Sequence, residues 1–106
     1  MPTRGTVIDP TLLRKTAGQA VGTLKVLANE ERLLVLCQLS QGEMCVTDLE
    51  EALDIHQPTL SQQLGVLRTE GVVNTRREGK YVYYSVADPN VMQVLEVLYR
   101  IYCANE

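Results

Sequence analysis

Apolar residues recur at helical spacing in several separate stretches of the chain. Between Thr11 and Ala28 they fall three or four residues apart, which forms a broad apolar stripe on one helical face. A second such stretch follows Asn29, a residue type that caps helix N-termini well. The last stretch follows Asp88 and Pro89, a cap and the proline that a first helical position favours. The pattern therefore predicts two helices early in the chain and one that closes it.

Two shorter helices are predicted between these segments. Thr47 and Glu50 have the spacing of a capping box, so a short helix is expected to begin at Thr47, after a loop at residues 43–46. A further helix follows within a few residues, with Pro58 in its first turn and Gly71 just past its end. Two short helices with a tight connection are typical of a helix-turn-helix.

The second helix of this pair has an unusual outer face. Leu60, Leu64 and Leu67 share its inner face, whereas its outer face carries uncharged side chains that both donate and accept hydrogen bonds. Such groups suit the base edges of a DNA major groove; the alternative is an ordinary amphipathic surface helix. The DNA-contacting residues predicted in this segment are Gln57, Thr59, Ser61, Gln62, Gln63 and Arg68.

After Gly71 the apolar period changes from about 3.6 to two. Residues 72–77 and 80–86 predict two strands joined through Gly79, and Arg76, Arg77 and Lys80 cluster at the tip of this hairpin. A basic-tipped hairpin that follows a recognition helix is typical of a winged helix, whose wing contacts phosphates or the minor groove. The alternative is a solvated hairpin that keeps charge on its edge. The predicted fold class is thus mainly α with a β-hairpin wing, a winged helix-turn-helix.

The length of 106 residues predicts one folded domain at residues 11–106, preceded by a flexible arm at residues 1–10. The net charge of −3 argues against a wholly basic nucleic-acid binder. The acidic residues concentrate in residues 30–54, however, and basic residues outnumber acidic ones in residues 55–86. Because local potential positions a protein on phosphates, the charge pattern is compatible with a double-stranded DNA partner.

Composition also bears on location and chemistry. No apolar run approaches the roughly 20 residues that cross a bilayer, and residues 1–6 lack the apolar core of a signal peptide. Three Cys do not suggest a secreted disulfide framework. We therefore expect a cytoplasmic protein without a membrane partner. A single His, at position 56, supplies no nucleophile–base pair, so neither an enzyme nor a cofactor is expected.

The last helix is more apolar than one small domain can cover, so we expect it to pair with the first helix and with a second copy of itself. A homodimer would follow from that pairing. The residues predicted at its interface are Leu13, Ala17, Leu24, Val91, Leu95, Leu98 and Tyr102.

The order of the predicted elements and four sequence words resemble the ArsR/SmtB family of winged helix-turn-helix repressors. The words are Leu-Ala-Asn-Glu-Glu-Arg-Leu at 27–33, Gln-Pro-Thr-Leu-Ser-Gln-Gln-Leu at 57–64, Val-Leu-Arg-Thr-Glu-Gly-Val-Val at 66–73 and Tyr-Val-Tyr-Tyr at 81–84. The resemblance implies a homodimer that binds an inverted-repeat operator. It also implies that an inducer changes the dimer and releases the DNA.

Metal-sensing members of that family differ from this chain at their ligands. Zinc sensors carry His on the last helix, whereas the only His here is His56. Arsenic and cadmium sensors carry Cys-Val-Cys-Asp at the short helix, whereas this chain has Cys45-Val46-Thr47-Asp48, with Thr47 in place of one thiol. A single Cys cannot hold a thiophilic ion, so no metal site is expected there.

Cys37 and Cys103, together with the word at 57–68, look like the biofilm-growth and sulfide-responsive repressors, whose paired thiols react with persulfides, polysulfides or oxidants. This resemblance implies a repressor released from its operator by modification of Cys37 and Cys103. Two alternatives stay open: a metalloid-sensing repressor that uses Cys37, Cys45 and Cys103, and a protein-interaction domain without DNA. Taken singly, Cys37 suits a small buried hydrophobe and Cys103 an incidental thiol near a helix end.

Overall fold

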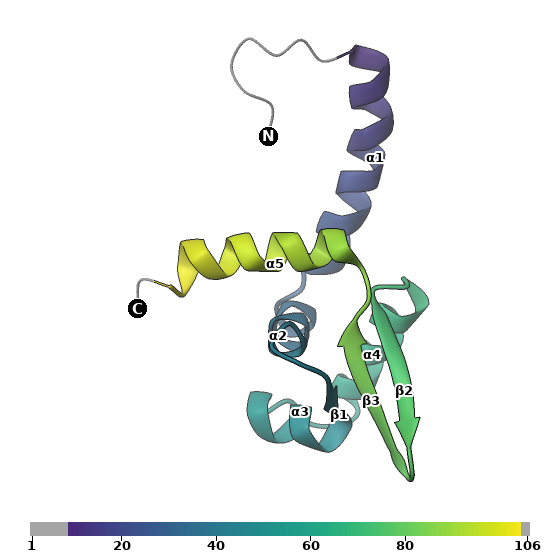
Figure 1. The fold of residues 1–106 in the computed structure, drawn as a ribbon, viewed down its shortest axis with the longest axis vertical. Helices are drawn as coiled ribbons and strands as arrows, with labels where there is room; N and C mark the ends of the chain where they lie inside the picture. Colours follow the sequence, from purple (N-terminus) through teal and green to yellow (C-terminus); the bar gives the residue numbers. More distant parts are fainter. Residues whose placement is uncertain (1–8, 105–106) are drawn as a thin grey trace.

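The computed structural model describes residues 9–104 and contains five helices and a small antiparallel sheet (Figure 1). The helices are α1 (Pro10–Leu27), α2 (Glu30–Leu39), α3 (Val46–Leu53), α4 (Thr59–Thr69) and α5 (Pro89–Tyr102). The strands are β1 (Met44–Cys45), β2 (Val73–Glu78) and β3 (Tyr81–Val86). This order confirms the predicted fold class, a winged helix-turn-helix in which the β2–β3 hairpin forms the wing.

The predicted caps of α2 and α5 are confirmed. The Asn29 side chain accepts a hydrogen bond from the backbone N–H of Arg32 at 3.0 Å. The Asp88 side chain accepts one from the N–H of Asn90 at 2.9 Å, with Pro89 at the first helical position. Each cap satisfies a backbone donor that the helix leaves without a partner, which explains why the two helices begin where the sequence indicates.

Helix α1 begins one residue earlier than predicted. The carboxylate of Asp9 accepts a hydrogen bond from the N–H of Thr11 at 2.9 Å, so Asp9 is the cap and Pro10 is the first helical residue. Pro10 therefore belongs to the helix and not to the predicted arm. Residues 1–8, the rest of that arm, lie outside the described residues.

The predicted capping box and the predicted loop before it are both wrong. Met44 and Cys45 form β1, which pairs with residues 83–84 of β3. Helix α3 starts directly after this strand at Val46, with Cys45 at its N-cap position and no side-chain cap. Thr47 therefore lies inside the first turn. Pairing with the sheet holds the chain extended up to Cys45, and this tertiary contact overrides the local signal at Thr47.

The side chain that caps helix α4 belongs to a residue before the N-cap position. Pro58 occupies the N-cap position, one residue before the predicted place, and offers no side-chain cap. The side-chain oxygen of Gln57 instead accepts a hydrogen bond from the N–H of Ser61 at 3.1 Å. At the other end, Gly71 has a φ of 72°, the left-handed conformation that glycine adopts readily just past a helix.

The sheet has the strand order β1-β3-β2, and the hairpin turn lies at Gly79, whose φ is 63°. The two strands of the hairpin begin and end within one residue of the predicted positions. Glu78, which was predicted in the turn, is instead the last residue of β2 and pairs with Tyr81. Because side chains alternate along a strand, neighbouring residues of the hairpin lie on opposite faces.

The core lies between α2, α3, α4 and the start of the hairpin. In the absence of Phe and Trp, it is filled mainly by Leu and Val. Its most buried members are Val35, Leu36, Leu49, Leu60, Leu64, Leu67 and Val91. Helix α5 crosses one end of this body, and α1 extends away from it (Figure 1). Among the helices in residues 9–104, none is both long and apolar enough to span a bilayer.

Candidate DNA interface and thiol pair

Helix α4 has the two faces that its sequence predicts. Leu60, Leu64 and Leu67 are buried against the core, whereas Ser61 and Gln62 are exposed. Thr59 is half-buried and Arg68 is exposed near the C-terminal end. Because its inner face is fixed by packing, α4 holds these polar side chains on a rigid support, as a surface that reads DNA requires.

Gln57 and Gln63, both predicted to contact DNA, already have partners within the chain. Gln57 caps α4, as described above. Gln63 is half-buried, and its side-chain oxygen accepts a hydrogen bond from Nη1 of Arg32 at 3.3 Å. The structure therefore separates these two glutamines from the exposed Ser61 and Gln62, although the sequence pattern grouped all four.

Arg32 is a structural residue that the sequence analysis did not single out. Its Nε donates to the carbonyl of Val26 at 2.7 Å, and its Nη2 donates to the carbonyl of Lys25 at 3.1 Å. With the bond to Gln63, one guanidinium joins the end of α1, the start of α2 and α4. One signal was available in the sequence: Arg32 is the only basic residue within the acidic stretch 30–54.

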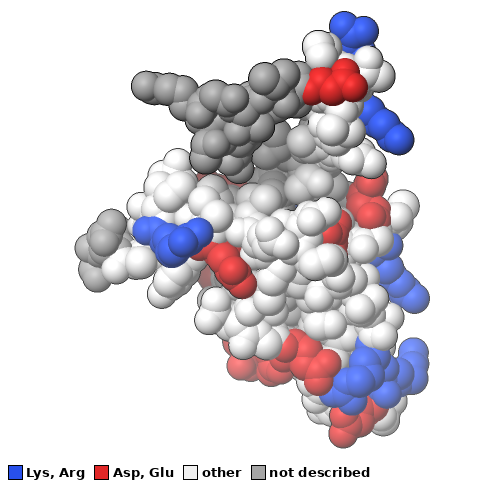
Figure 2. All heavy atoms as spheres, turned by 45° about the horizontal axis from the view of Figure 1, so that its top comes forward, with Lys and Arg blue, Asp and Glu red and all other residues white. Residues whose placement is uncertain are grey.

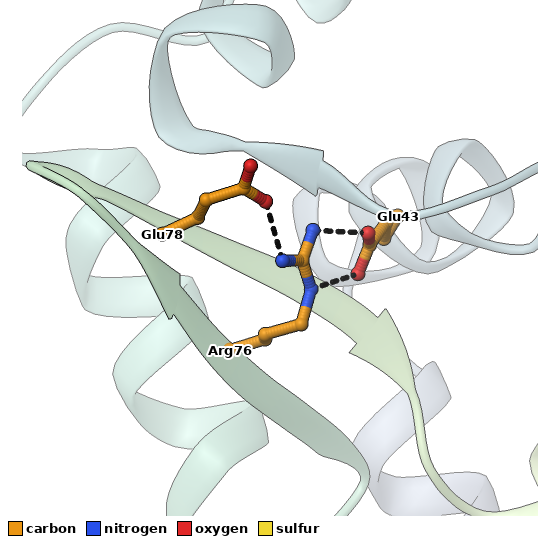
Figure 3. Close-up of polar contacts among 3 residues, drawn as sticks. All are labelled: Glu43, Arg76 and Glu78. Atoms are coloured by element: carbon orange, nitrogen blue, oxygen red, sulfur yellow. Dashed lines mark hydrogen bonds and ion pairs between the residues drawn. The ribbon is translucent and has the colours of Figure 1, made fainter.

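The three basic residues of the wing, grouped by the sequence, occupy different environments. The guanidinium of Arg76 is hydrogen-bonded to the carboxylates of Glu43 and Glu78 (Figure 3). Arg77, the next residue along β2, is exposed and forms no ion pair within residues 9–104. The Lys80 ammonium lies 5.5 Å from the centre of a tyrosine ring at the hairpin tip.

Charge at this end of the molecule is mixed. Figure 2 shows Lys and Arg side chains at the end where the hairpin lies, directly beside Asp and Glu side chains. The hydrogen bond from Arg76 holds the pKa of Glu43 below its usual range, so this carboxylate is ionised at neutral pH. The chain's one His is also on the surface, where its Nε2 lies 2.9 Å from the Asp54 carboxylate.

The structure brings Cys37 and Cys103 close enough to interact electrostatically. Cys37 lies on α2, Cys103 follows the last turn of α5, and both are exposed. Partial burial, and after it the charge of the Cys103 thiolate, raise the pKa of the Cys37 thiol. Packing has thus brought together two thiols that lie far apart in the sequence.

The surface between these helices is hollowed. A groove separates the end of α2 from α5, lined by Ser40 and Gln41 on one side and by Tyr99 and Arg100 on the other. The Ser40 hydroxyl donates to the carbonyl of Cys37 at 2.6 Å. The groove therefore begins next to the α2 segment that carries one thiol.

Cys45 differs from the other two thiols, because it is buried and belongs to strand β1 of the sheet. In the described part of the chain, no three His, Cys, Asp or Glu side chains come together as a metal site would require. This arrangement gives no support to the alternative in which Cys37, Cys45 and Cys103 jointly bind a metalloid.

The predicted dimer residues fall into two groups. Val91 and Leu95 are only 1% and 2% exposed, because they pack into the protomer's own core, so their assignment to a dimer surface is corrected. Leu13, Ala17, Leu24 and Tyr102 are exposed, and Leu98 is half-buried. The predicted interface did not include three further exposed apolar side chains on α5, which are Val97, Tyr99 and Ile101.

A helix-turn-helix with an exposed polar face, followed directly by a basic hairpin, defines the chain as a winged-helix DNA-binding protein. Comparison with known proteins narrows this class. A family model described as "Bacterial regulatory protein, arsR family" matches residues 29–75.

The similar proteins match almost the whole chain. The chain is 50% identical over 94 residues to the biofilm growth-associated repressor of Agrobacterium fabrum, which covers 89% of the chain and 80% of that protein. It is 42% identical over 91 residues to the transcriptional activator HlyU of Vibrio cholerae, with coverage of 86% and 84%. The crystal structure of the repressor BigR from Xylella fastidiosa matches with a TM-score of 0.84 at 41% identity, over 92% of this chain and 99% of that one.

The chain therefore belongs to the ArsR family of bacterial regulatory proteins, as its sequence words predicted. It is a DNA-binding transcriptional regulator and not an enzyme.

The raised pKa of Cys37 leads to a test of the thiol pair. Iodoacetamide alkylates only the thiolate, so the labelling rate of Cys37 should rise with pH. The pH at which this rate reaches half its maximum, the midpoint, should lie above that of an ordinary cysteine. Cys103→Ser removes the neighbouring charge, so the midpoint should fall but stay above the ordinary value because burial persists. Peptide mass spectrometry measures the labelling, and Cys45→Ser is the control. An ordinary midpoint in the native chain would contradict the geometry.

Proposed function

We propose that this chain represses transcription as a homodimer and leaves an inverted-repeat operator when a persulfide, polysulfide or oxidant modifies Cys37 and Cys103. The observation that carries the proposal is that two exposed thiols, one on α2 and one just after α5, lie within electrostatic range of each other. Exposed thiols are accessible to a sulfur donor or oxidant, whereas Cys45 is buried.

Similar proteins give independent support. The relative from Agrobacterium fabrum is named a repressor. One matching solved structure is of reduced HlyU from Vibrio cholerae, with a TM-score of 0.82 and 42% identity over 86% of this chain and 96% of that one. That name distinguishes a redox state of HlyU. A redox-dependent state in this chain would require a thiol, and Cys37 and Cys103 are the exposed ones.

The proposed chemistry is stepwise thiol exchange. The Cys103 thiolate attacks the outer sulfur of a persulfide RSSH, which gives a Cys103 persulfide and releases the thiol RSH. The Cys37 thiolate then attacks Sγ of Cys103, which forms a disulfide and releases H₂S. Two protein thiols and one RSSH thus give one disulfide, RSH and H₂S. Further sulfur atoms inserted before closure would bridge a gap longer than the Cα separation of about 7 Å that a disulfide permits.

Bridging changes the geometry that an inverted repeat requires. A bond between α2 and α5 links the helix that packs against α4 to a proposed dimer helix. The two recognition helices of a dimer must meet half-sites about 34 Å apart on one face of the duplex. Moving α5 relative to α2 would change this spacing, so we infer that the reduced dimer binds the operator and the bridged dimer releases it.

The DNA contacts are proposed from the exposure of their side chains, except that Thr59 is half-buried at the start of α4. Thr59, Ser61 and Gln62 on α4 face the base edges in this proposal. Arg68 at the end of α4, with Arg77 and Lys80 on the wing, faces the phosphates or the minor groove. We assign base recognition to the uncharged set and general attraction to the charged set.

The dimer is proposed from the apolar side chains that the protomer leaves exposed. Leu24 on α1 is 58% exposed and Tyr102 on α5 is 70% exposed, and Leu13, Val97 and Ile101 are also exposed on the same two helices. So many large apolar side chains on two helices favour a second copy as the partner.

The proposed DNA contacts predict that two substitutions weaken DNA binding in different ways. Gln62→Ala should weaken operator binding by about 1–3 kcal/mol and relax specificity at one base pair. Arg77→Ala should weaken binding to all duplexes and lower the slope of log affinity against log salt by about 1. Fluorescence anisotropy across a salt series measures both, with Arg14→Ala on α1 as control. Native affinity in both variants would show that the assignments of α4 and the wing are wrong.

The thiol pair predicts which cysteines the switch needs. Cys37→Ser and Cys103→Ser should each bind the operator normally and fail to release it after polysulfide treatment, because neither can close the bridge. Cys45→Ser is the matched control and should release DNA like the native chain. Release that persists in both single variants would refute the pairing. Arsenite binding that requires Cys37, Cys45 and Cys103 together would favour the metalloid alternative.

The dimer predicts an effect of charge on α1. Leu24→Glu places a carboxylate in the proposed apolar interface, so it should yield folded monomers at micromolar concentration, whereas the native chain sediments as a dimer. Val66→Glu is the control, since Val66 is an exposed apolar residue on α4, outside the proposed interface. A native chain that sediments as a folded monomer would refute the dimer.

A further inference from the structure

The guanidinium of Arg76 uses all three of its nitrogen atoms within the chain. Nε and Nη2 donate to the two carboxylate oxygens of Glu43, and Nη1 donates to Glu78 (Figure 3). Cζ of the same guanidinium lies over the Tyr83 ring, 4.9 Å from its centre. A bidentate pair with stacking is the arrangement in which Arg is most firmly held on a protein surface.

The strand register shows what this contact joins. Arg76 on the outer strand β2 lies opposite Tyr83 on the central strand β3, and Tyr83 in turn lies opposite Cys45 of β1. Glu43 directly precedes β1, in the turn that follows α2. The Arg76 side chain thus crosses over β3, and it fastens the free edge of the wing to the turn between α2 and β1.

The charge of this cluster disfavours DNA. One guanidinium is surrounded by two carboxylates, and its hydrogen bond to Glu43 keeps that acid ionised at neutral pH. A phosphate that approached Arg76 would therefore approach Glu43 and Glu78 as well. Like charges in contact oppose binding, so this face of the wing offers little net attraction for a duplex.

The opposite face of the hairpin differs. Arg77 follows Arg76 on β2, pairs in register with Val82, and projects to the other side of the strand. In residues 9–104 its guanidinium makes no ion pair. The Lys80 ammonium instead lies over Tyr81, which pairs with Glu78 and so belongs to the Arg76 face. The side of the wing opposite Arg76 therefore carries a cation without an ion-pair partner among the described residues, which is Arg77.

We propose that Arg76 is a positioning residue that anchors the wing through Glu43, and that the wing meets DNA with the face that carries Arg77. This inference rests on the proposed role of the wing in DNA binding. It assigns different functions to two adjacent arginines that look equivalent in the sequence.

Salt dependence separates the two functions. A residue that neutralises a phosphate releases a counterion, and its loss lowers the slope of log affinity against log salt by about 0.9. Arg77→Gln should show this change in the full-length reduced protein on an operator duplex. Arg76→Gln should leave the slope at its native value and weaken binding by the same factor at every salt concentration. We expect that factor to be about two to five, as for loss of an exposed ion pair.

Glu43→Gln provides the matched control, since it removes the ion pair that holds Arg76 but leaves the positive charge of Arg76 in place. It should reproduce the salt-independent loss of Arg76→Gln, and the double variant should lose no more than either single one. If Arg76 instead contacts phosphate, Glu43→Gln should steepen the slope and tighten binding, which would overturn the inference. An equal drop in slope for Arg76→Gln and Arg77→Gln would also overturn it.

The outcomes also distinguish a failure of this inference from a failure of the proposed role of the wing in DNA binding. If neither arginine variant changes the slope while Arg68→Gln does, the wing has no phosphate contact and the proposed wing function fails. Circular dichroism of each variant confirms that the fold is intact. Tyr83→Leu removes the stacking partner of Arg76 without a change of charge, and it should give the same salt-independent loss.

Discussion

Burial of aliphatic side chains between α2, α3 and α4 is the constraint on which the other features of this protein depend. Leu36, Leu49 and Leu60 are fully buried there, and they fill the space that aromatic residues occupy in many small domains. Because these residues face inward, the polar residues of α4 must face outward. The same packing sets the start of the hairpin, since Val72 and Val73 are buried directly after α4.

Arg32 adds a polar connection to this apolar core. Its guanidinium satisfies two carbonyls at the end of α1, where the helix leaves acceptors without partners. It also orients Gln63 on α4. The direction in which α1 leaves the body is thus linked to the position of the recognition helix. In a dimer formed by α1 and α5, this link would relate the interface to the spacing of the two recognition helices.

The thiol pair and the wing both depend on the segment that leaves α2. Cys37 lies near the end of α2, Ser40 hydrogen-bonds to its carbonyl, and Glu43 in the following turn holds Arg76. One short stretch therefore borders both the proposed sensing site and the anchor of the wing. A regulator of this size has few elements, and neighbouring functions share the same backbone.

The sequence by itself determined the elements with strong local signals. The caps at Asn29 and Asp88, the apolar face of α4 and the glycine after it are each decided by a few neighbouring residues, so their positions could be predicted. The four sequence words also identified the family, because each word is a run of neighbouring residues that includes such local features. The grouping of polar residues on α4 and of basic residues on the wing was visible, but their individual roles were not.

Tertiary structure decided everything that depends on a distant partner. Strand β1 exists because Met44 and Cys45 pair with β3, and this pairing overrode the capping signal at Thr47. Val91 and Leu95 belong to the core because α5 lies across the body, which helical periodicity alone cannot show. The roles of Arg76 and Gln63 also changed, since hydrogen bonds to Glu43 and Arg32 join residues about thirty positions apart. Local sequence determines which face a side chain occupies, and only packing determines what that face meets.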